Sequence, residues 1–369
     1  MNGIYLSQDL SHAVGILEKI NKQIDEFEDN DFQITKHINS KRNTAHLIRN
    51  LLPFFSQQYF DTKNIQWQNY QFAYIRKGAV LDKSVVELLK KARKLNPSIK
   101  IILEIPTYPY LDEFTGLVKL DIWMKEKRWT KKLAGYVDRI VTYSDDKEIF
   151  GIPCINISNA YEFNRVPQRQ FTKITNEAPL QLIGVATLCF YHGYDRLIEG
   201  LKTYYESNEV SKEVQFILVG DGPVLKDYHR LVEEYNLSPF VMLSGKKDLS
   251  ELDQYYQNAD IGIDSLGRHR SGVTYNSSLK GKEYLAKGLP IVSGVKTDLD
   301  DRDVPFYYRV PNDDTPIDIA EIVHWYEQLT REKEKQKLSE EIYTYGKSNF
   351  TFPVTFSPVI NYLKGDLHE

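Results

Sequence analysis

The stretch NSSLKGKEYLAKGLPIV, residues 276–292, gathers hydroxyl, ammonium and carboxylate groups at the start of one expected helix. Ser277 and Ser278 follow a polar loop and lie where a helix N-cap is expected. The free N–H groups and positive dipole end of such a helix can hold a phosphate, and Lys280 adds a full charge. Glu283 lies close to Lys280 on the helix surface and could accept from a ribose diol. Because the same residues also make an ordinary helix start, spacing alone leaves both interpretations open.

Basic side chains stand in two turns, each between an expected strand and an expected helix. The loop GRHRSGVTYN contributes Arg268 and Arg270, and CFYHGYDRLIEGL contributes His192 and Arg196. These groups are candidate phosphate contacts, although a lone histidine in a loop is more often exposed or capping. VGDGP, residues 219–223, lacks the GxGxxG spacing and favours a structural turn over a dinucleotide site.

The first half of the chain offers a second set of polar groups at the ends of apolar strands. Gly15 lies at the start of an expected helix, where a small residue lets a ligand approach the backbone. Arg76 closes the strand FAYIR, and Glu104 closes IKIILE. A polar and aromatic rim among prolines follows and suits either a sugar ring or a rigid turn: Thr107, Tyr108 and Tyr110.

Short apolar runs alternate with amphipathic stretches along the whole chain, which is typical of an α/β fold with parallel sheets. Five apolar runs before residue 159 and five after residue 180 predict two Rossmann-like domains, in keeping with 369 residues. The segment 161–179 loses this periodicity and is interpreted as the interdomain linker. The stretch 317–363 has helical character.

Charge and composition narrow the class of protein. The formal net charge of −4 argues against a nucleic-acid binder. Residues 1–162 nevertheless carry about +3 and the remainder about −7, so the first half is better suited to an anionic surface. The two cysteines indicate neither a disulfide framework nor a zinc site. No membrane span or secretory leader is predicted, which favours a cytoplasmic protein.

One helix of the first half is a candidate for membrane contact. KLDIWMKEKRWTKKLAG, residues 119–135, interleaves Lys and Arg with tryptophans, a pattern that suits an anionic membrane interface. A solvated helix with a core-facing stripe explains the same pattern, so both interpretations stay open.

Taken in order, several motifs resemble the family-4-like glycosyltransferases of the GT-B fold, especially bacterial enzymes of capsular or exopolysaccharide assembly. The resemblance covers most of the chain and is most specific in the second half, in HGYDRLIEGL, FILVGDGP and KEYLAKGLPIVS. It implies two Rossmann-like domains facing a central cleft, with the C-terminal helix crossing back to the first domain. The expected domains are 1–162, joined by about 346–369, for the acceptor, and 163–345 for the nucleotide-sugar donor.

The resemblance also implies an activity and roles for individual residues. The expected reaction moves a sugar from a nucleotide-diphosphate sugar, of the UDP type, to a glycan or lipid-linked oligosaccharide at the inner face of the plasma membrane, with retention and without a metal or other cofactor. Glu283 is expected to hold the ribose, Gly15 to face the phosphates, and 243–245, with Ser244 and Gly245, to lie near the base. The remaining donor contacts are expected from six residues: His192, Arg196, Arg268, Ser277, Ser278 and Lys280. The expected catalytic groups are Lys280, Arg270 and Glu104, and the expected acceptor contacts are Arg76, Thr107, Tyr108 and Tyr110.

The chain departs from the family pattern at four positions. Pro106 stands where the family commonly has a histidine that touches the donor sugar, and Glu104 or Arg76 is expected to substitute for it. Thr187 and His192 replace the usual Arg and Lys, and Tyr275 replaces a glutamate. Lys280 and the nearby arginines are expected to compensate. The departures leave two alternatives, a catalytically silent partner subunit of the same fold and a sugar-nucleotide epimerase or hydrolase.

Overall fold

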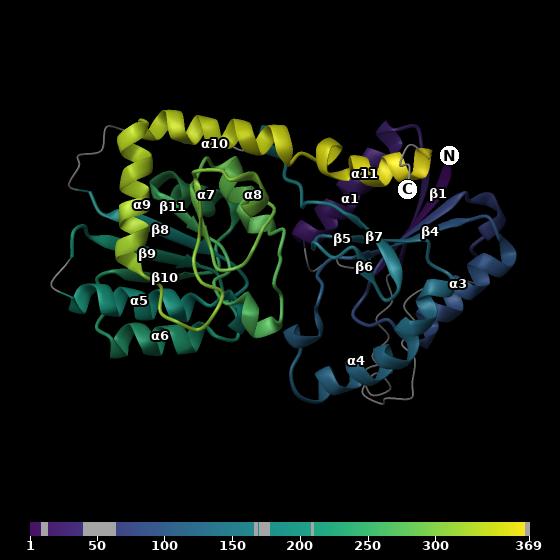
Figure 1. The fold of residues 1–369 in the computed structure, drawn as a ribbon, viewed down its shortest axis with the longest axis horizontal. Coiled ribbons are helices and arrows are strands. Elements are labelled where there is room, and N and C mark those ends of the chain that lie inside the picture. Colours follow the sequence, from purple (N-terminus) through teal and green to yellow (C-terminus); the bar gives the residue numbers. More distant parts are fainter. Residues whose placement is uncertain (9–13, 40–63, 166–168, 170–177, 208–209, 366–369) are drawn as a thin grey trace. The chain divides into compact units, whose positions relative to one another are not determined.

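The computed structural model describes residues 1–8, 14–39, 64–165, 169, 178–207 and 210–365 of the chain. The described residues form two compact units (Figure 1). Unit 1 comprises Met1–Ser158 and Phe352–Glu369, and unit 2 comprises Asn159–Thr351. The chain therefore passes between the units twice, once on either side of unit 2.

Unit 1 is built on a seven-stranded sheet with the order β2-β1-β3-β4-β5-β7-β6. All neighbouring strands are parallel except β6 and β7. The strands are β1 (Asn2–Gln8), β2 (Gln33–Asn39), β3 (Phe72–Arg76), β4 (Lys100–Ile105), β5 (Arg139–Thr142), β6 (Glu148–Ile149) and β7 (Ile152–Asn156). The helices are α1 (Val14–Asp29), α3 (Lys83–Leu95), α4 (Gly116–Trp129) and α11 (Phe352–Lys364).

Helices cover both faces of the unit 1 sheet, so the central strands are apolar on both sides. On one face α1 and α11 pack together, and Phe27 and Phe356 meet at 5.0 Å between ring centroids. On the other face α3 buries Val85, Leu88 and Leu89 against the sheet. The C-terminal helix thus belongs to the first unit, as the resemblance implied.

Unit 2 contains a six-stranded, fully parallel sheet with the order β10-β9-β8-β11-β12-β13. Its strands are β8 (Leu180–Val185), β9 (Val214–Val219), β10 (Val241–Gly245), β11 (Ile261–Ile263), β12 (Ile291–Ser293) and β13 (Tyr307–Arg309). Its helices are α5 (Tyr194–Glu206), α6 (Leu225–Glu234), α7 (Leu249–Asn258), α8 (Leu279–Ala286), α9 (Ile319–Glu332) and α10 (Lys335–Asn349).

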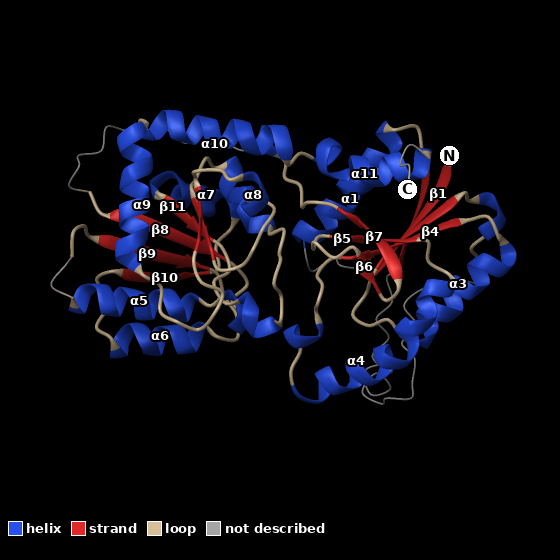
Figure 2. Cartoon of the chain, in the orientation of Figure 1, coloured by secondary structure: helices blue, strands red, loops and turns tan. Residues whose placement is uncertain are grey.

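Two hydrophobic clusters fill the two faces of the unit 2 sheet. One cluster joins the strands to α5, α6 and α9, and the other joins them to α7, α8 and α10. Figure 2 shows these helices flanking the strands, which is the layering of a Rossmann-like unit. The predicted α/β class with two Rossmann-like units is therefore confirmed. In a parallel sheet of this kind ligands bind beyond the carboxyl ends of the strands, so a ligand of unit 2 is expected at loops such as those after β8 and β11.

Strands β2, β6 and β13, which were not predicted from the sequence, lie at the edges of their sheets. Edge strands here are short or polar, so they lack the apolar runs that mark the central strands. The expected linker 161–179 also begins too late. Phe163 is 1% exposed in the core of unit 2, and the boundary falls at Ser158. Within that segment the structure describes residues 161–165, 169 and 178–179.

Candidate functional site

The start of α8 brings Ser278 and Lys280 to the carboxyl end of β11. Ser278 is the N-cap residue; its hydroxyl accepts from the N–H of Gly281 at 3.3 Å and donates to Asp264 at 2.9 Å. The ammonium of Lys280 donates to the hydroxyl of Ser265 at 2.9 Å and lies 3.4 Å from Asp264. Burial lowers the pKa of Lys280 to about 8, and Asp264 limits the fall. The start of α8 thus carries an ammonium group that a buried carboxylate holds in place.

His192 lies in the loop after β8 and faces the same cations. Its Nδ1 accepts from the backbone N–H of Cys189 at 3.0 Å, so Nε2 carries the proton of the neutral ring. Burial, followed by the charges of Lys280 and Arg268, lowers its pKa well below the usual value. His192 is therefore a neutral hydrogen-bond donor at neutral pH, not a third cation.

Arg268 completes this group from the loop after β11. Its guanidinium lies 4.5 Å from the ring centroid of Tyr191, and its charge acts on both Lys280 and His192. The backbone N–H of Leu266 donates to the carbonyl of His192 at 2.7 Å, which joins the two loops. The structure therefore gathers Lys280, Arg268 and His192 at the carboxyl ends of β8 and β11. We call these three residues, two cations and one neutral hydrogen-bond donor, the cationic group.

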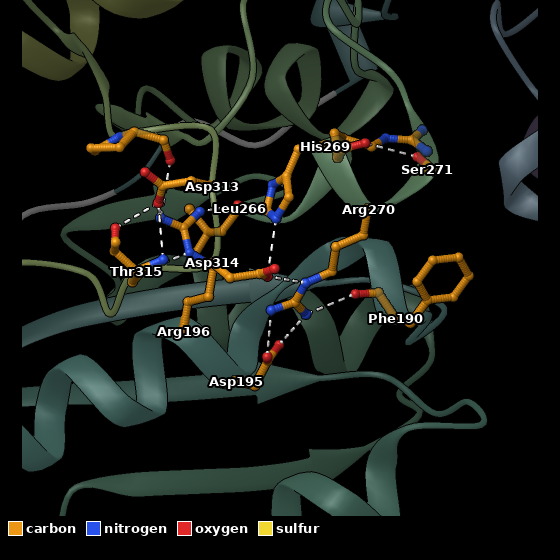
Figure 3. Close-up of polar contacts among 12 residues, drawn as sticks. Phe190, Asp195, Arg196, Leu266, His269, Arg270, Ser271, Asp313, Asp314 and Thr315 are labelled. Carbon is orange, nitrogen blue, oxygen red and sulfur yellow. Dashed lines mark hydrogen bonds and ion pairs between the residues drawn. The ribbon is translucent and has the colours of Figure 1, made fainter.

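Arg270 does not belong to the cationic group. Its guanidinium makes two bonds to Asp195 at 2.7 and 2.8 Å, one to Asp314 at 2.7 Å and one to the carbonyl of Phe190 at 3.1 Å (Figure 3). These bonds tie together three loops, and Asp195 raises the pKa of Arg270 further. We therefore reassign Arg270 from a catalytic role to a structural one, in which it holds together the loops around the site.

Arg196 has a similar structural position. It is 1% exposed, and its guanidinium donates to the carbonyls of Leu266, Pro311 and Thr315 (Figure 3). A buried guanidinium with these partners cannot turn toward a ligand without leaving carbonyls unpaired. We therefore assign Arg196 a structural role as well.

Ser277 is buried and bonded elsewhere, although it precedes the N-cap. It is 1% exposed; its hydroxyl donates to Asp298 at 2.6 Å and accepts from the N–H of Asn159 at 2.8 Å. Ser277 was expected to lie along a diphosphate. Its hydroxyl is instead bonded to Asp298 and Asn159 inside unit 2, so we assign it a structural role.

The other expected donor contacts lie on unit 2 but have different surroundings. Glu283 is half-buried on α8, and burial raises its pKa against the lowering effects of Tyr256 and Lys287. Ser244 and Gly245 end β10, where the carbonyl of Gly245 accepts from the N–H of Gly220 at 2.9 Å. The contacts of these residues with a ribose or a base stay predictions.

The VGDGP turn is structural, as its spacing favoured. A Cβ added to Gly220, whose φ is +145°, would lie 1.8 Å from the carbonyl oxygen of Ala186. The glycine thus lets the loops after β8 and β9 pack closely.

Glu104, an expected catalytic group, is completely buried inside unit 1. It pairs with Arg76 and accepts from Tyr74 at 2.6 Å and from Gln23 at 2.9 Å. Burial alone would raise the pKa of Glu104, but Arg76 and Lys19 lower it. The carboxylate is ionised and fully bonded, so we reassign Glu104, and Arg76 with it, to a structural ion pair.

The remaining expected residues of unit 1 vary in accessibility. Gly15 is exposed at the start of α1, and no atom lies within 4 Å of an added Cβ. Thr107 and Tyr108 are half-buried, whereas Tyr110 is buried and donates to Glu126 at 2.7 Å. Gly15, Thr107 and Tyr108 thus remain available to a ligand, and their contacts stay predictions.

The basic segment 119–135 begins inside α4 (Gly116–Trp129) and continues through the following 3₁₀ turn, Thr130–Gly135. Unusually, α4 exposes apolar side chains: Leu117, Val118, Leu120 and Trp123. Four exposed cations follow them: Lys127, Arg128, Lys131 and Lys132. Lys125 is an exception, because it is buried in a 2.6 Å pair with Asp121. Within the described residues, no helix combines the length and apolar character needed to cross a membrane.

Sequence reasoning missed the residues that hold the cationic group in place. Asp264 and Ser265 directly follow the apolar run of β11, and this position after a buried strand was a usable signal. Asp298 and Lys282 gave no such signal, because their pairing depends on tertiary contacts.

Solved structures with the same architecture define the chain as a protein of the GT-B glycosyltransferase fold. A glycosyltransferase from Rickettsia africae aligns with a TM-score of 0.64 at 12% identity, over 99% of this chain and 98% of that one. HepE of Anabaena in complex with UDP aligns with a TM-score of 0.62 at 12% identity, over 99% and 100%. The resemblance to GT-B glycosyltransferases is thus confirmed for the fold.

Curated relatives share a shorter part of the sequence. Alpha-monoglucosyldiacylglycerol synthase of Acholeplasma laidlawii is 27% identical over 169 residues, which are 44% of this chain and 39% of the relative. The synthase of the same name from Streptococcus pneumoniae is 30% identical over 87 residues, 23% of this chain and 20% of the relative. The matched part thus spans less than half the length of either relative. No family model matches the chain.

Proposed function

We propose that the chain is a glycosyltransferase that takes a UDP-sugar as donor and transfers the sugar to an acceptor lipid at a membrane surface. The observation that carries the donor half of the proposal is the cationic group beside the α8 N-terminus, at the carboxyl ends of β8 and β11. The solved structure of HepE with UDP and the names of both curated relatives support the same reaction class.

The cationic group has the charge that a departing nucleotide diphosphate needs. As the glycosidic bond to phosphate breaks, negative charge grows on the diphosphate, and preorganised cations and N–H groups stabilise it. The Lys280 ammonium, the Arg268 guanidinium and the Nε2 proton of His192 would supply this stabilisation, with the N–H groups at the start of α8. The proposed reaction is retaining and independent of a metal ion.

A donor screen tests the proposal. Purified protein would be incubated with UDP-, GDP- and dTDP-sugars, and release of the nucleoside diphosphate would be measured with and without EDTA. We expect release from a UDP-sugar, unchanged by EDTA. Release only in the presence of a divalent ion would contradict metal independence, and no release from any donor would contradict the activity.

The pKa of Lys280 predicts how UDP binding depends on pH. Lys280 is protonated below pH 8 and loses its charge above it, so UDP affinity should be constant from pH 7 toward 8 and then fall. One proton limits the fall to about tenfold per pH unit. Calorimetry between pH 7 and 9.5 measures it, with Lys280→Arg as the control because a guanidinium stays charged. An equal fall in both proteins would assign the effect to another group.

The acceptor half of the proposal is carried by α4. Exposed leucine, valine and tryptophan side chains followed by four cations suit the interface of an anionic bilayer. Both curated relatives are named as synthases of a diacylglycerol glycolipid. We therefore favour a lipid acceptor over a soluble glycan, and a peripheral position at the inner face of the plasma membrane.

Vesicle binding measures the contribution of α4. Replacing Lys127, Arg128, Lys131 and Lys132 with glutamine should weaken binding to phosphatidylglycerol-rich vesicles at least tenfold, since each cation contributes about 1 kcal/mol. The matched control replaces four exposed lysines elsewhere on unit 1: Lys36, Lys83, Lys90 and Lys94. Equal losses in both variants would show a nonspecific charge effect and contradict a docking role for α4.

A catalytically silent partner subunit is the second candidate, because Thr187 is an exposed neutral residue and Tyr275 is no carboxylate. Such a protein would show neither UDP binding by thermal shift nor donor hydrolysis. UDP binding that disappears in Lys280→Ala supports the enzyme instead.

A further inference from the structure

The two chain segments that connect unit 2 to unit 1 are bonded to each other inside unit 2. The first connection enters unit 2 at Asn159, and the second leaves it after Thr351. The N–H of Tyr161 donates to the carbonyl of Phe350 at 2.9 Å. Because of this hydrogen bond, the first connection cannot move away from its position at Tyr161 without disturbing the second connection at Phe350.

Asn159 fixes the first connection to the residue that precedes the α8 cap. Its backbone N–H donates to the Ser277 hydroxyl at 2.8 Å, and its side-chain amide donates to the Ser277 carbonyl. The Ser277 hydroxyl in turn donates to Asp298 at 2.6 Å. The connection is thus bonded to the backbone and side chain of the residue next to Ser278.

Lys282 brings the second connection into the same cluster. Its ammonium pairs with Asp298 and lies 4.0 Å from the ring centroid of Phe350. Lys282 is on α8, two residues after Lys280. Ser277, Lys282, Asp298 and Asn159 are all less than 9% exposed. A buried ion pair adds little net stability, but breaking it is costly, so it fixes one arrangement of its surroundings.

We propose that Asn159, Ser277, Lys282 and Asp298 form a latch that links nucleotide binding at the α8 start to the order of both connections. These are positioning residues, because their polar groups are bonded to one another and buried away from a ligand. Linkage is reciprocal: a diphosphate that steadies the α8 start also steadies the connections, and loosening the latch weakens diphosphate binding. The inference rests on the proposed UDP site and adds the coupling.

Hydrogen exchange followed by mass spectrometry tests the latch in the full chain. Peptides covering 158–163 and 345–352 report the connections, and a peptide covering 276–286 reports the α8 start. In the wild type, UDP should slow exchange in all three. In Ser277→Ala, exchange at 158–163 should be faster without UDP, UDP should protect the α8 start alone, and UDP affinity should fall about tenfold.

Two further variants keep the result interpretable. Ser144→Ala removes a matched buried hydroxyl, which donates to Asp146 at 2.6 Å in unit 1, and should leave UDP affinity unchanged. Asn159→Ala removes one bond of the latch and substitutes for Ser277→Ala if the latter fails to fold.

The outcomes separate the coupling from the donor site. Protection of the α8 start by UDP with unchanged exchange at both connections would overturn the latch and leave the donor site intact. Persistence of the UDP effect at the connections in Ser277→Ala would also overturn it. Absence of UDP protection in every peptide, with no thermal shift, would instead refute the proposed function.

Discussion

Lys280→Ala is expected to lower kcat/KM for a UDP-sugar by about 10²–10³-fold, the usual loss when a preorganised donor to a developing anion is removed. By the resemblance, Thr187 and the neutral His192 are expected to stand where the family has basic residues. Lys280 and Arg268 are therefore the cations of the group on which the leaving diphosphate would depend. Steady-state kinetics with the donor identified by the screen measures the effect.

Lys280→Arg, together with a control substitution on α6, separates the effect of charge from an effect on folding. Lys280→Ala leaves Asp264, which is 1% exposed, without its cation, so a loss of stability is expected as well. Lys280→Arg keeps the charge and should recover part of the activity. Lys226→Ala, at an exposed position on α6, should have no effect. A change in kcat/KM of less than threefold in Lys280→Ala would contradict the proposed role.

Glu104→Gln is expected to destabilise unit 1 by about 3–5 kcal/mol at pH 7, because it leaves the buried Arg76 guanidinium without its carboxylate. Arg76 and Lys19 are both less than 9% exposed. The lowered pKa of Glu104 means that its stabilising contribution is complete above the unfolded value of about 4.3 and is lost only as pH falls through the lower folded pKa. Neutral pH therefore shows the full effect.

Urea denaturation, with hydrogen exchange of β3 and β4 as the readout for unit 1, measures this loss. The matched control is Glu87→Gln, which breaks an exposed pair with Lys83 at 3.3 Å and should cost less than about 1 kcal/mol. A loss for Glu104→Gln as small as that of the control would show that the buried pair is dispensable. It would then reopen an active role for Glu104.

The order of the elements was readable from the sequence because the central strands of a parallel sheet are buried on both faces and leave continuous apolar runs. The same periodicity located the glycine turns and the start of α8, since capping and turn residues act over three or four positions. Polar edge strands such as β2 and β13 do not leave this mark.

Which polar side chains are accessible was decided by tertiary structure. Arg270, Arg196, Ser277 and Glu104 have the residue types of a site, yet each is committed to partners far away in the chain, such as Asp314, Thr315, Asp298 and Arg76. Local spacing cannot show which partners a polar side chain has in the folded chain. The sequence by itself determined that cations, hydroxyls and the start of a helix lie near the carboxyl ends of the strands. Only the folded structure decided that Lys280, Arg268 and His192 form the cationic group, because burial and distant partners set each group's charge and freedom.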